Sequence, residues 1–147
     1  GFLCYPGGVE DGERLDGCVD AVERAGLGDK LTVLPAHLVA ESAHPDIAKF
    51  IASSSTRPHG IVAASDVIAM SALRALSEFG LAVPGDVRVV GYDGLAICEQ
   101  TVPRLSTVSQ DLTKGANHLI DMLFRRISGE DTASVVMQPE LIVRMSS

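Results

Sequence analysis

The sequence predicts an α/β fold, with a parallel sheet that carries helices on both of its faces in three layers. Short apolar runs of strand length alternate along the chain with segments whose apolar residues recur at helical spacing, which is typical of a parallel sheet. The 147 residues are 46% hydrophobic and 21% charged, the composition of a well-packed domain. In residues 60–93, a polar residue follows each of two predicted strands. Ligands of open parallel sheets bind at that edge, so the pattern indicates a small-molecule site.

The first predicted elements are a strand, a helix and a second strand. Residues 2–5 form a short apolar run, and a loop over 6–12 leads into a helix over 13–25. One face of that helix carries apolar residues at positions i, i+3, i+4 and i+7, namely Leu15, Cys18, Val19 and Val22. Gly26 ends the helix, and residues 31–34 form the next strand.

The middle of the chain repeats this order of elements. A helix is predicted over residues 45–51, with apolar side chains facing inward, and a strand over 61–64. The helix that follows carries one apolar face, made of Ala69, Ala72, Leu73 and Leu76. Gly80 stops this helix, and a strand over 87–92 runs into Asp93.

The last third contains one strong helix between extended pieces. Residues 105–108 are extended, and residues 112–127 form a helix with seven apolar side chains on one side. Two short strands are predicted after it, over 134–138 and 141–143, with Pro139 as a break between them.

Charge and cysteine usage narrow the class of protein. With 12 basic and 19 acidic residues the formal charge is −7, so this segment by itself is not expected to hold DNA. Cys4, Cys18 and Cys98 lack CxxC spacing and are expected as buried thiols outside disulfides, which favours a reducing compartment. No run of about 20 apolar residues and no signal peptide is visible, so we expect a cytoplasmic protein without a membrane partner. The chain opens inside a strand without a Met, which we interpret as a fragment of something longer.

Four features in a fixed order carry a resemblance to a known family. They are ERLDG at 13–17, then IVAASD at 61–66, then VP, DV and VGYD within 83–93, and last PRLSTV and QD within 103–111, before the tail ELIVR at 140–144. Together they cover nearly the whole chain, which resembles the effector-binding core of lactose/galactose-repressor-type transcription regulators. These regulators have an N-terminal helix-turn-helix and a two-lobed core of the periplasmic-binding-protein-like type.

The resemblance implies a truncated type I lobe of that core. Residues 1–100 would form the C-terminal lobe, residues 101–130 a crossover whose helix belongs to the missing N-terminal lobe, and residues 131–147 the strands that return. The implied function is effector sensing and dimerisation for a DNA-binding regulator whose headpiece lies outside this chain. The implied partners are a sugar-like effector and a second copy of the chain, with DNA reached only through the missing N-terminal region.

Arg14 and Asp93 are the first candidate ligand-binding residues. Arg14 follows a strand and a glycine-containing loop, so its planar array of donors is able to reach the sheet edge and pair with sugar hydroxyls or a carboxylate. Asp93 ends a strand, where its carboxylate accepts hydrogen bonds from ligand hydroxyls or ring nitrogens. The alternatives are purely structural: Arg14 would be a surface arginine on a first helical turn, and Asp93 would cap a turn before Gly94. The resemblance places effector contacts at both positions.

Ser65 and Asp66 have a structural role and a possible ligand role. One of the two is expected to cap the helix that follows. In the resembling proteins the position of Ser65 is often Asn and touches the effector, whereas Asp66 is mainly structural. A serine forms fewer hydrogen bonds there than an asparagine amide.

The loop around residue 37 departs from the family pattern. Relatives often carry Asp and then an aromatic at the places of His37 and Leu38, where the ring stacks on a sugar or purine face. Leu38 has no ring to stack, which argues against purine recognition through this lobe and puts the usual hydroxyl-to-Asp bond at His37 in doubt. Tyr5 is an alternative source of a ring, with a core or pocket-wall role equally open.

Four residues are candidates for a dimer interface by the same resemblance: Met70, Leu73, Leu95 and Ile97. Ordinary core packing is the alternative for Leu73. The apolar face of the helix at 112–127 also has to be covered, because exposure of its large side chains to water forgoes several kcal/mol of burial free energy. We expect self-association of this chain, with exchange of that helix or an N-terminal lobe as the cover.

Other kinds of site find little support in the sequence. The glycines at 7, 8 and 12 lack GxGxxG spacing and no Gly-Lys-Ser/Thr occurs, so a phosphate loop is not expected. The four histidines lack metal-ligand spacing, and we expect neither a metal nor another cofactor. The first alternative function is a periplasmic sugar-binding protein for transport or chemotaxis. The second is an α/β enzyme acting on a nucleotide or phosphosugar, against which no nucleophile paired with a general base is visible.

Overall fold

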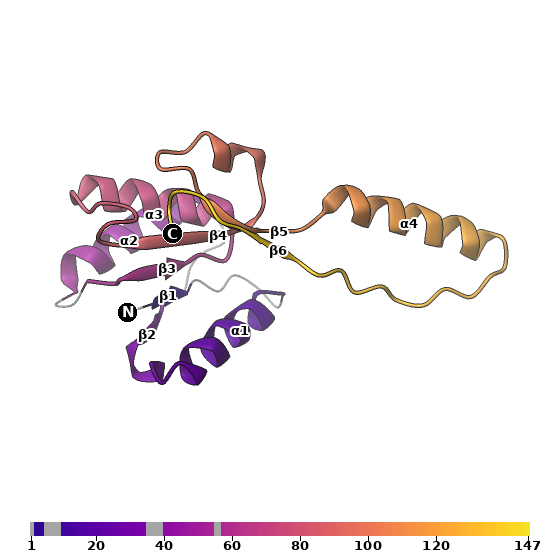
Figure 1. Ribbon diagram of the computed structural model, residues 1–147, viewed down its shortest axis with the longest axis horizontal. Helices are drawn as coiled ribbons and strands as arrows, with labels where there is room; N and C mark the ends of the chain where they lie inside the picture. The colour runs from indigo at the N-terminus through magenta and orange to yellow at the C-terminus, as the bar shows by residue number, and fades with distance from the viewer. Residues whose placement is uncertain (1, 5–9, 35–39, 55–56) are drawn as a thin grey trace.

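Six strands form one sheet in the order β2-β1-β3-β4-β5-β6. The computed structural model (Figure 1) describes residues 2–4, 10–34, 40–54 and 57–147. The strands are β1 (Phe2–Cys4), β2 (Leu31–Val33), β3 (Gly60–Val62), β4 (Arg88–Asp93), β5 (Ser106–Ser109) and β6 (Glu140–Ile142). The first five strands run parallel, and β6 pairs antiparallel with β5. The parallel α/β sheet is therefore confirmed, with one antiparallel edge strand added.

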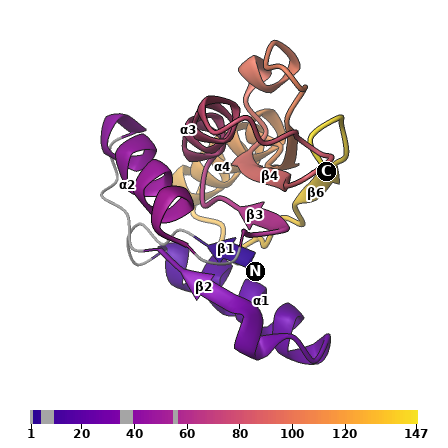
Figure 2. The same cartoon turned by 90° about the vertical axis from the view of Figure 1, so that its left-hand side faces the viewer.

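Helices cover both faces of this sheet. The helices on the sheet are α1 (Glu10–Arg24), α2 (Ala40–Ser53) and α3 (Asp66–Glu78), whereas α4 (Leu112–Ile127) lies away from it. Two short 3-10 turns are η1 (Gly28–Lys30) and η2 (Ala96–Glu99). Figure 2 shows α1 on one side of the sheet and α2 with α3 on the other. This is the predicted three-layer arrangement, and it buries parallel strands on both faces, as such strands require.

The hydrophobic core lies between the sheet and the pair α2 and α3. Ile47 of α2, Leu76 of α3 and Val89 of β4 are almost fully excluded from solvent there. The helices pack against each other as well as on the sheet, so the core is continuous along this face. Helix α2 begins before the predicted start at Pro45, which lies inside the helix.

Strand β4 divides its side chains between the two faces. Val89 and Gly91 are buried on the α3 side, and a side chain at Gly91 would meet Ala69 of α3. Val90 and Tyr92 point the other way, where they line a cavity beneath α1. The alternation follows from the period of two in an extended strand. It brings Tyr92 to the α1 side at the carboxyl end of the strand.

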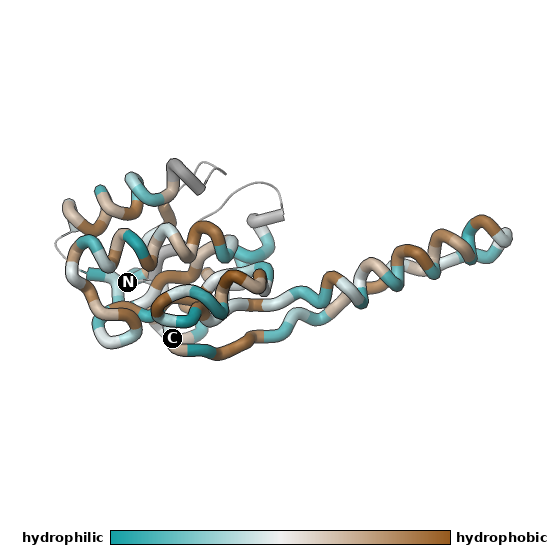
Figure 3. The backbone as a smooth tube through the Cα atoms, turned by 90° about the horizontal axis from the view of Figure 1, so that it is seen from above, coloured by the Kyte–Doolittle hydropathy of each residue, from teal (hydrophilic) through white to brown (hydrophobic). Residues whose placement is uncertain are grey.

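Helix α4 stands away from the sheet as an arm. The chain leaves through β5, forms α4 and returns through residues 131–139 to β6, as Figures 1 and 3 show. None of the α4 side chains, all of which the structure describes, is buried. The thioether of Met137 on the returning segment lies over Gly115 of α4. The predicted strand over 134–138 is wrong: the segment runs beside a helix, and a helix offers no ladder of unpaired backbone groups to join.

The last residues tie the returning chain to the sheet. The Ser146 hydroxyl accepts a hydrogen bond from the Ser106 amide (2.8 Å) and donates one to the carbonyl of Val89 (2.6 Å). The Val89 amide in turn donates to the backbone carbonyl of Ser146 (2.7 Å). Because these groups are buried, each bond satisfies a polar group that water does not reach.

Candidate functional site

The candidate site lies at the carboxyl edge of the sheet, where β3 and β4 end. The strand order reverses direction between β1 and β3, since β2 lies on one side of β1 and β3 on the other. Ligands of doubly wound sheets bind outside the carboxyl ends of the strands at such a switch point. Arg14 reaches this edge from α1, Ser65 follows β3, and Asp93 ends β4.

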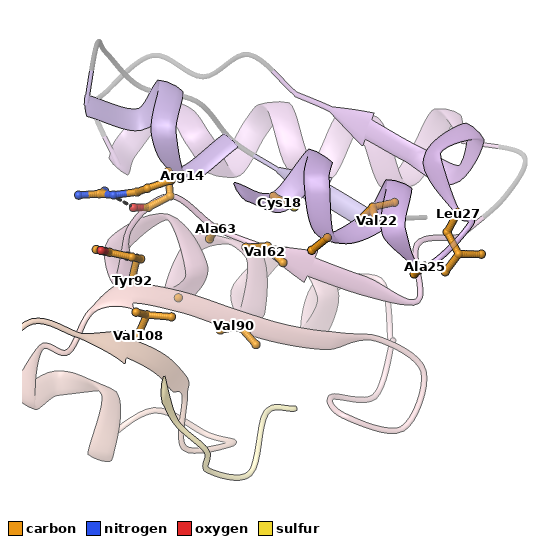
Figure 4. A pocket seen from close by; sticks show the side chains of 13 residues that line it. Arg14, Cys18, Val22, Ala25, Leu27, Val62, Ala63, Val90, Tyr92 and Val108 are labelled. Atoms are coloured by element: carbon orange, nitrogen blue, oxygen red, sulfur yellow. Dashed lines mark hydrogen bonds between the residues drawn. The ribbon is translucent and has the colours of Figure 1, made fainter. Parts of the chain in front are cut away.

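Arg14 is fixed at this edge by two contacts. Its Nη1 donates a hydrogen bond to the carbonyl of Ala64 (2.8 Å), just beyond the end of β3. Its guanidinium carbon lies 4.0 Å from the centroid of the Tyr92 ring, a cation–π contact from β4. Figure 4 shows the two side chains facing one another at the edge. Half-buried and held beside the ends of β3 and β4, the guanidinium has a restricted orientation at this edge.

Asp93 occupies an unusual backbone conformation at the end of β4. Its φ of 117° lies outside the left-handed well near 57°, and the following Gly94 has a φ of 75°. The side chain is half-buried. Two successive positive φ angles turn the chain sharply away from the strand, so the carboxylate lies at the turn itself.

Ser65 is the N-cap of α3. Its hydroxyl accepts a hydrogen bond from the amide of Ile68 (3.3 Å). A hydroxyl is able to donate while it accepts, so capping and ligand contact are compatible at this residue. Asp66, the first residue of α3, is instead fully buried, in agreement with its expected structural role.

Asp66 joins three parts of the chain beneath the site. Its Oδ1 accepts a hydrogen bond from the hydroxyl of Thr107 on β5 (2.5 Å), and its Oδ2 accepts one from the amide of Leu95 (2.7 Å). The buried Cys98 also contacts this carboxylate. Burial, and then the hydrogen bond and charge of Asp66, raise the pKa of the Cys98 thiol to about 12.

A cavity of about 370 Å³ lies behind Arg14, between α1 and the sheet. Its walls are mostly aliphatic, from Val22 of α1 to Val62, Val90 and Val108 of three strands (Figure 4). Such walls do not supply the hydrogen bonds that a polar ligand needs. We therefore place the candidate site at the polar edge and not inside this cavity.

The remaining predicted site residues fall into two groups. Tyr5, His37 and Leu38 lie outside the described residues. Of the interface candidates, Leu73 is buried in the core, Met70 and Leu95 pack against that core, and Ile97 is exposed. Core packing of Leu73 is the alternative that the sequence left open.

Tyr92 is the site residue that sequence reasoning overlooked. It was interpreted only as the last residue of a strand, although the alternation along β4 places it on the α1 side. The signal was present: Val87 and Val89 share one face, so Tyr92 belongs to the opposite one, toward the helix that carries Arg14.

Among the residues that the structure describes, no three His, Cys, Asp or Glu side chains are grouped so as to hold a metal ion. In the same part of the chain, no helix has the length and apolar character that crossing a membrane requires. Cys98 is buried and Cys18 half-buried, and no disulfide joins either of them to a described residue.

Comparison with known proteins agrees with the geometry. The sequence model of the periplasmic binding protein-like domain family matches residues 2–147. The HTH-type transcriptional repressor PurR of Pasteurella multocida is 31% identical over 138 residues, which cover 90% of this chain and 40% of that protein. PurR of Edwardsiella ictaluri is 32% identical over 141 residues, or 92% of this chain and 40% of the relative. The chain thus spans about 40% of the length of these curated relatives.

Solved structures of regulators share the fold over nearly the whole chain. A complex of the transcriptional regulator CelR with cellobiose is 30% identical with a TM-score of 0.88, over 99% of this chain and 46% of that one. A LacI family transcriptional regulator from Enterococcus faecium with bound ribose is 25% identical with a TM-score of 0.87, over 99% of this chain and 55% of that one. These relatives are transcriptional repressors and regulators.

Proposed function

This chain belongs to the family of periplasmic binding protein-like domains and matches the effector-binding portion of lactose/galactose-repressor-type regulators, and from that membership we propose that it senses a small-molecule effector for a DNA-binding transcription regulator. The DNA-reading headpiece belongs to another part of that regulator. The acidic charge of this chain, −7, agrees with a role away from the phosphate backbone. As further parts of this proposal, the protein is cytoplasmic and its role is ligand sensing and not catalysis.

The observation that carries the proposal is the fixed guanidinium of Arg14 beside the end of β4. The contacts with the Ala64 carbonyl and the Tyr92 ring hold it at the same sheet edge as Asp93. A planar donor array and a carboxylate at one edge match a ligand that both accepts and donates hydrogen bonds. Ser65 adds a hydroxyl at the end of the neighbouring strand.

A sugar or sugar-like polyol fits these groups best. Neighbouring hydroxyls of a sugar accept from a guanidinium and donate to a carboxylate at the same time. Regulators of the same fold hold cellobiose and ribose in solved structures, which supports the same ligand class here. An extended purine ring requires an aromatic stacking face, and Leu38 has none to offer.

The arm formed by α4 supports a two-lobed arrangement. We assign the sheet, β5 included, with α1, α2 and α3 to one lobe, which narrows the predicted crossover over 101–130. We assign α4, with the segment 131–139 beside it, to contact with a second lobe, because α4 buries none of its described side chains on this one. An effector between two lobes favours the closed arrangement if it binds that arrangement better, and the shift reaches the DNA-binding part. Dimerisation through Met70, Leu95 and Ile97 is part of the same proposal.

Calorimetric titration tests the ligand assignment. We expect ribose, lactose or cellobiose to bind, and Arg14→Ala or Asp93→Ala to weaken binding roughly 10–100-fold, the effect of losing a charged hydrogen-bond partner. Arg88→Ala is the matched control, since Arg88 is exposed at the opposite end of β4. Unchanged affinity in both site variants would defeat the assignment. Conversion of any sugar to a product would favour the enzyme alternative.

Sequencing of the reading frame around this segment tests the regulator itself. A helix-turn-helix upstream, followed by the first part of the core, is the expected result. A signal peptide without such a headpiece would instead identify a periplasmic sugar-binding protein for transport or chemotaxis.

A further inference from the structure

We propose that Asp66 and Thr107 are positioning residues that hold Asp93 in the backbone conformation needed for effector binding. The inference rests on the proposed function in one respect only, that Asp93 contacts the effector. Neither residue reaches the ligand edge itself, because both side chains are fully buried under it.

The two amides that follow Asp93 are bound by this buried pair. The Gly94 amide donates to the hydroxyl oxygen of Thr107 (3.2 Å), and the Leu95 amide donates to Oδ2 of Asp66 (2.7 Å). The Thr107 hydroxyl donates in turn to Oδ1 of Asp66 (2.5 Å). One carboxylate from α3 and one hydroxyl from β5 thus direct the turn at the end of β4.

The conformation at Asp93 requires such restraint. A φ of 117° is unfavourable for a residue with a Cβ atom, and residues held in such a conformation are strained. They persist only where the surroundings over-determine them, as happens at ligand clamps. Because φ sets the direction of the Cα–Cβ bond, the bonds to Gly94 and Leu95 also set where the Asp93 carboxylate points.

Strand β4 is shaped to admit the buried carboxylate. A Cβ atom at Gly91 would collide with Oδ1 of Asp66, so only glycine leaves the space that this carboxylate occupies. Gly94 is packed in the same way against Ser109 of β5. A fully buried carboxylate is costly unless it is hydrogen-bonded, so its place here is explained by the turn that it directs.

The test compares Thr107→Val with Thr107→Ser in the protein of the full reading frame. Valine keeps the shape and removes the hydroxyl, whereas serine keeps the hydroxyl. Without any ligand, we expect Thr107→Val to speed hydrogen exchange at the Gly94 and Leu95 amides about tenfold or more, and to change φ at Asp93 in a crystal structure. Thr107→Ser should leave both unchanged. Unaltered exchange and φ in Thr107→Val would overturn the proposal.

Binding of ribose, lactose and cellobiose supplies the second measurement. Thr107→Val should weaken binding of the best of these sugars about tenfold, and Thr107→Ser should restore it. In an Asp93→Ala background the valine variant should cause no further loss, because the pair acts through Asp93. An equal loss in that background would overturn the proposal.

Asp66→Asn provides a second route if the valine variant does not fold. It keeps the side-chain shape, turns one acceptor into a donor, and should shift exchange at the Leu95 amide in the same direction. If none of the three sugars binds the unaltered protein, the sugar assignment of the proposed function fails. Exchange and φ then still decide whether Asp66 and Thr107 hold the turn.

Discussion

The apolar face of α4 gives the largest single effect that the structure predicts. Six large side chains of this helix are between 54% and 72% exposed: Leu112, Leu119, Ile120, Leu123, Phe124 and Ile127. Each contributes roughly 1.5–3 kcal/mol when fully buried, and the six are about two-thirds exposed on average, so exposure of this face to water forgoes on the order of 6–12 kcal/mol. Two such faces brought together gain about twice that, roughly 12–24 kcal/mol, against the roughly 4–15 kcal/mol that association costs. The 147-residue chain on its own should therefore self-associate.

Replacing Leu119, Leu123 and Ile127 by glutamine tests this reasoning. The three residues form one stripe along α4 and lie on average about two-thirds exposed. Their loss from both copies removes about half of the gain, roughly 6–12 kcal/mol, which corresponds to a dissociation constant weaker by about four orders of magnitude or more. Sedimentation equilibrium over a range of concentrations measures the change directly.

The matched control substitutes glutamine on the polar side of the same helix, at Asn117 and Asp121. Both are exposed, so association should be unchanged while helix length and position are preserved. Circular dichroism verifies that α4 stays helical in both variants. A chain that remains monomeric with its apolar face intact would refute the reasoning, as would equal weakening by the control.

Two further predictions concern the buried carboxylate of Asp66. Gly91→Ala drives a methyl group into this carboxylate and should lower the free energy of unfolding by about 1–3 kcal/mol. Gly17→Ala, in open space on α1, should raise the free energy of unfolding by up to about 1 kcal/mol. Urea denaturation measures both values, and equal stability of the two variants would contradict the close approach of Gly91 to Asp66. Because the pKa of Cys98 is raised to about 12, its thiolate at pH 8 is about a thousandfold scarcer than that of an ordinary thiol. A thiol-labelling reagent should therefore modify the half-buried Cys18 before Cys98. Equal labelling rates of the two cysteines in the folded protein would contradict this prediction.

The elements that were predicted correctly from the sequence are those whose ends are set by residues close to them in the chain. Helix α4 begins and ends at the predicted residues, because Asp111 caps its first turn and Gly129 follows with a positive φ. The prediction of a strand over 134–138 was wrong because a strand depends on a partner that is distant in the sequence. It forms only where a neighbouring strand offers backbone groups to pair with. Nothing in residues 134–138 reveals that α4 leads this segment away from the sheet.

The same division runs through the candidate site. Arg14 and Asp93 were predicted from their places after a strand and at a strand end, a rule that needs no knowledge of partners. The pairing of Asp66 with Thr107 spans 41 residues, and no periodicity links two positions so far apart. An aspartate directly after an N-cap is fully explained by the helix dipole, so the sequence gives no reason to look for a second role. Only the fold brings β5 beneath the turn after β4 and places the Asp66 carboxylate under the site. The positioning of Asp93 therefore depends on contacts that the sequence does not show, and measurement is needed to establish it.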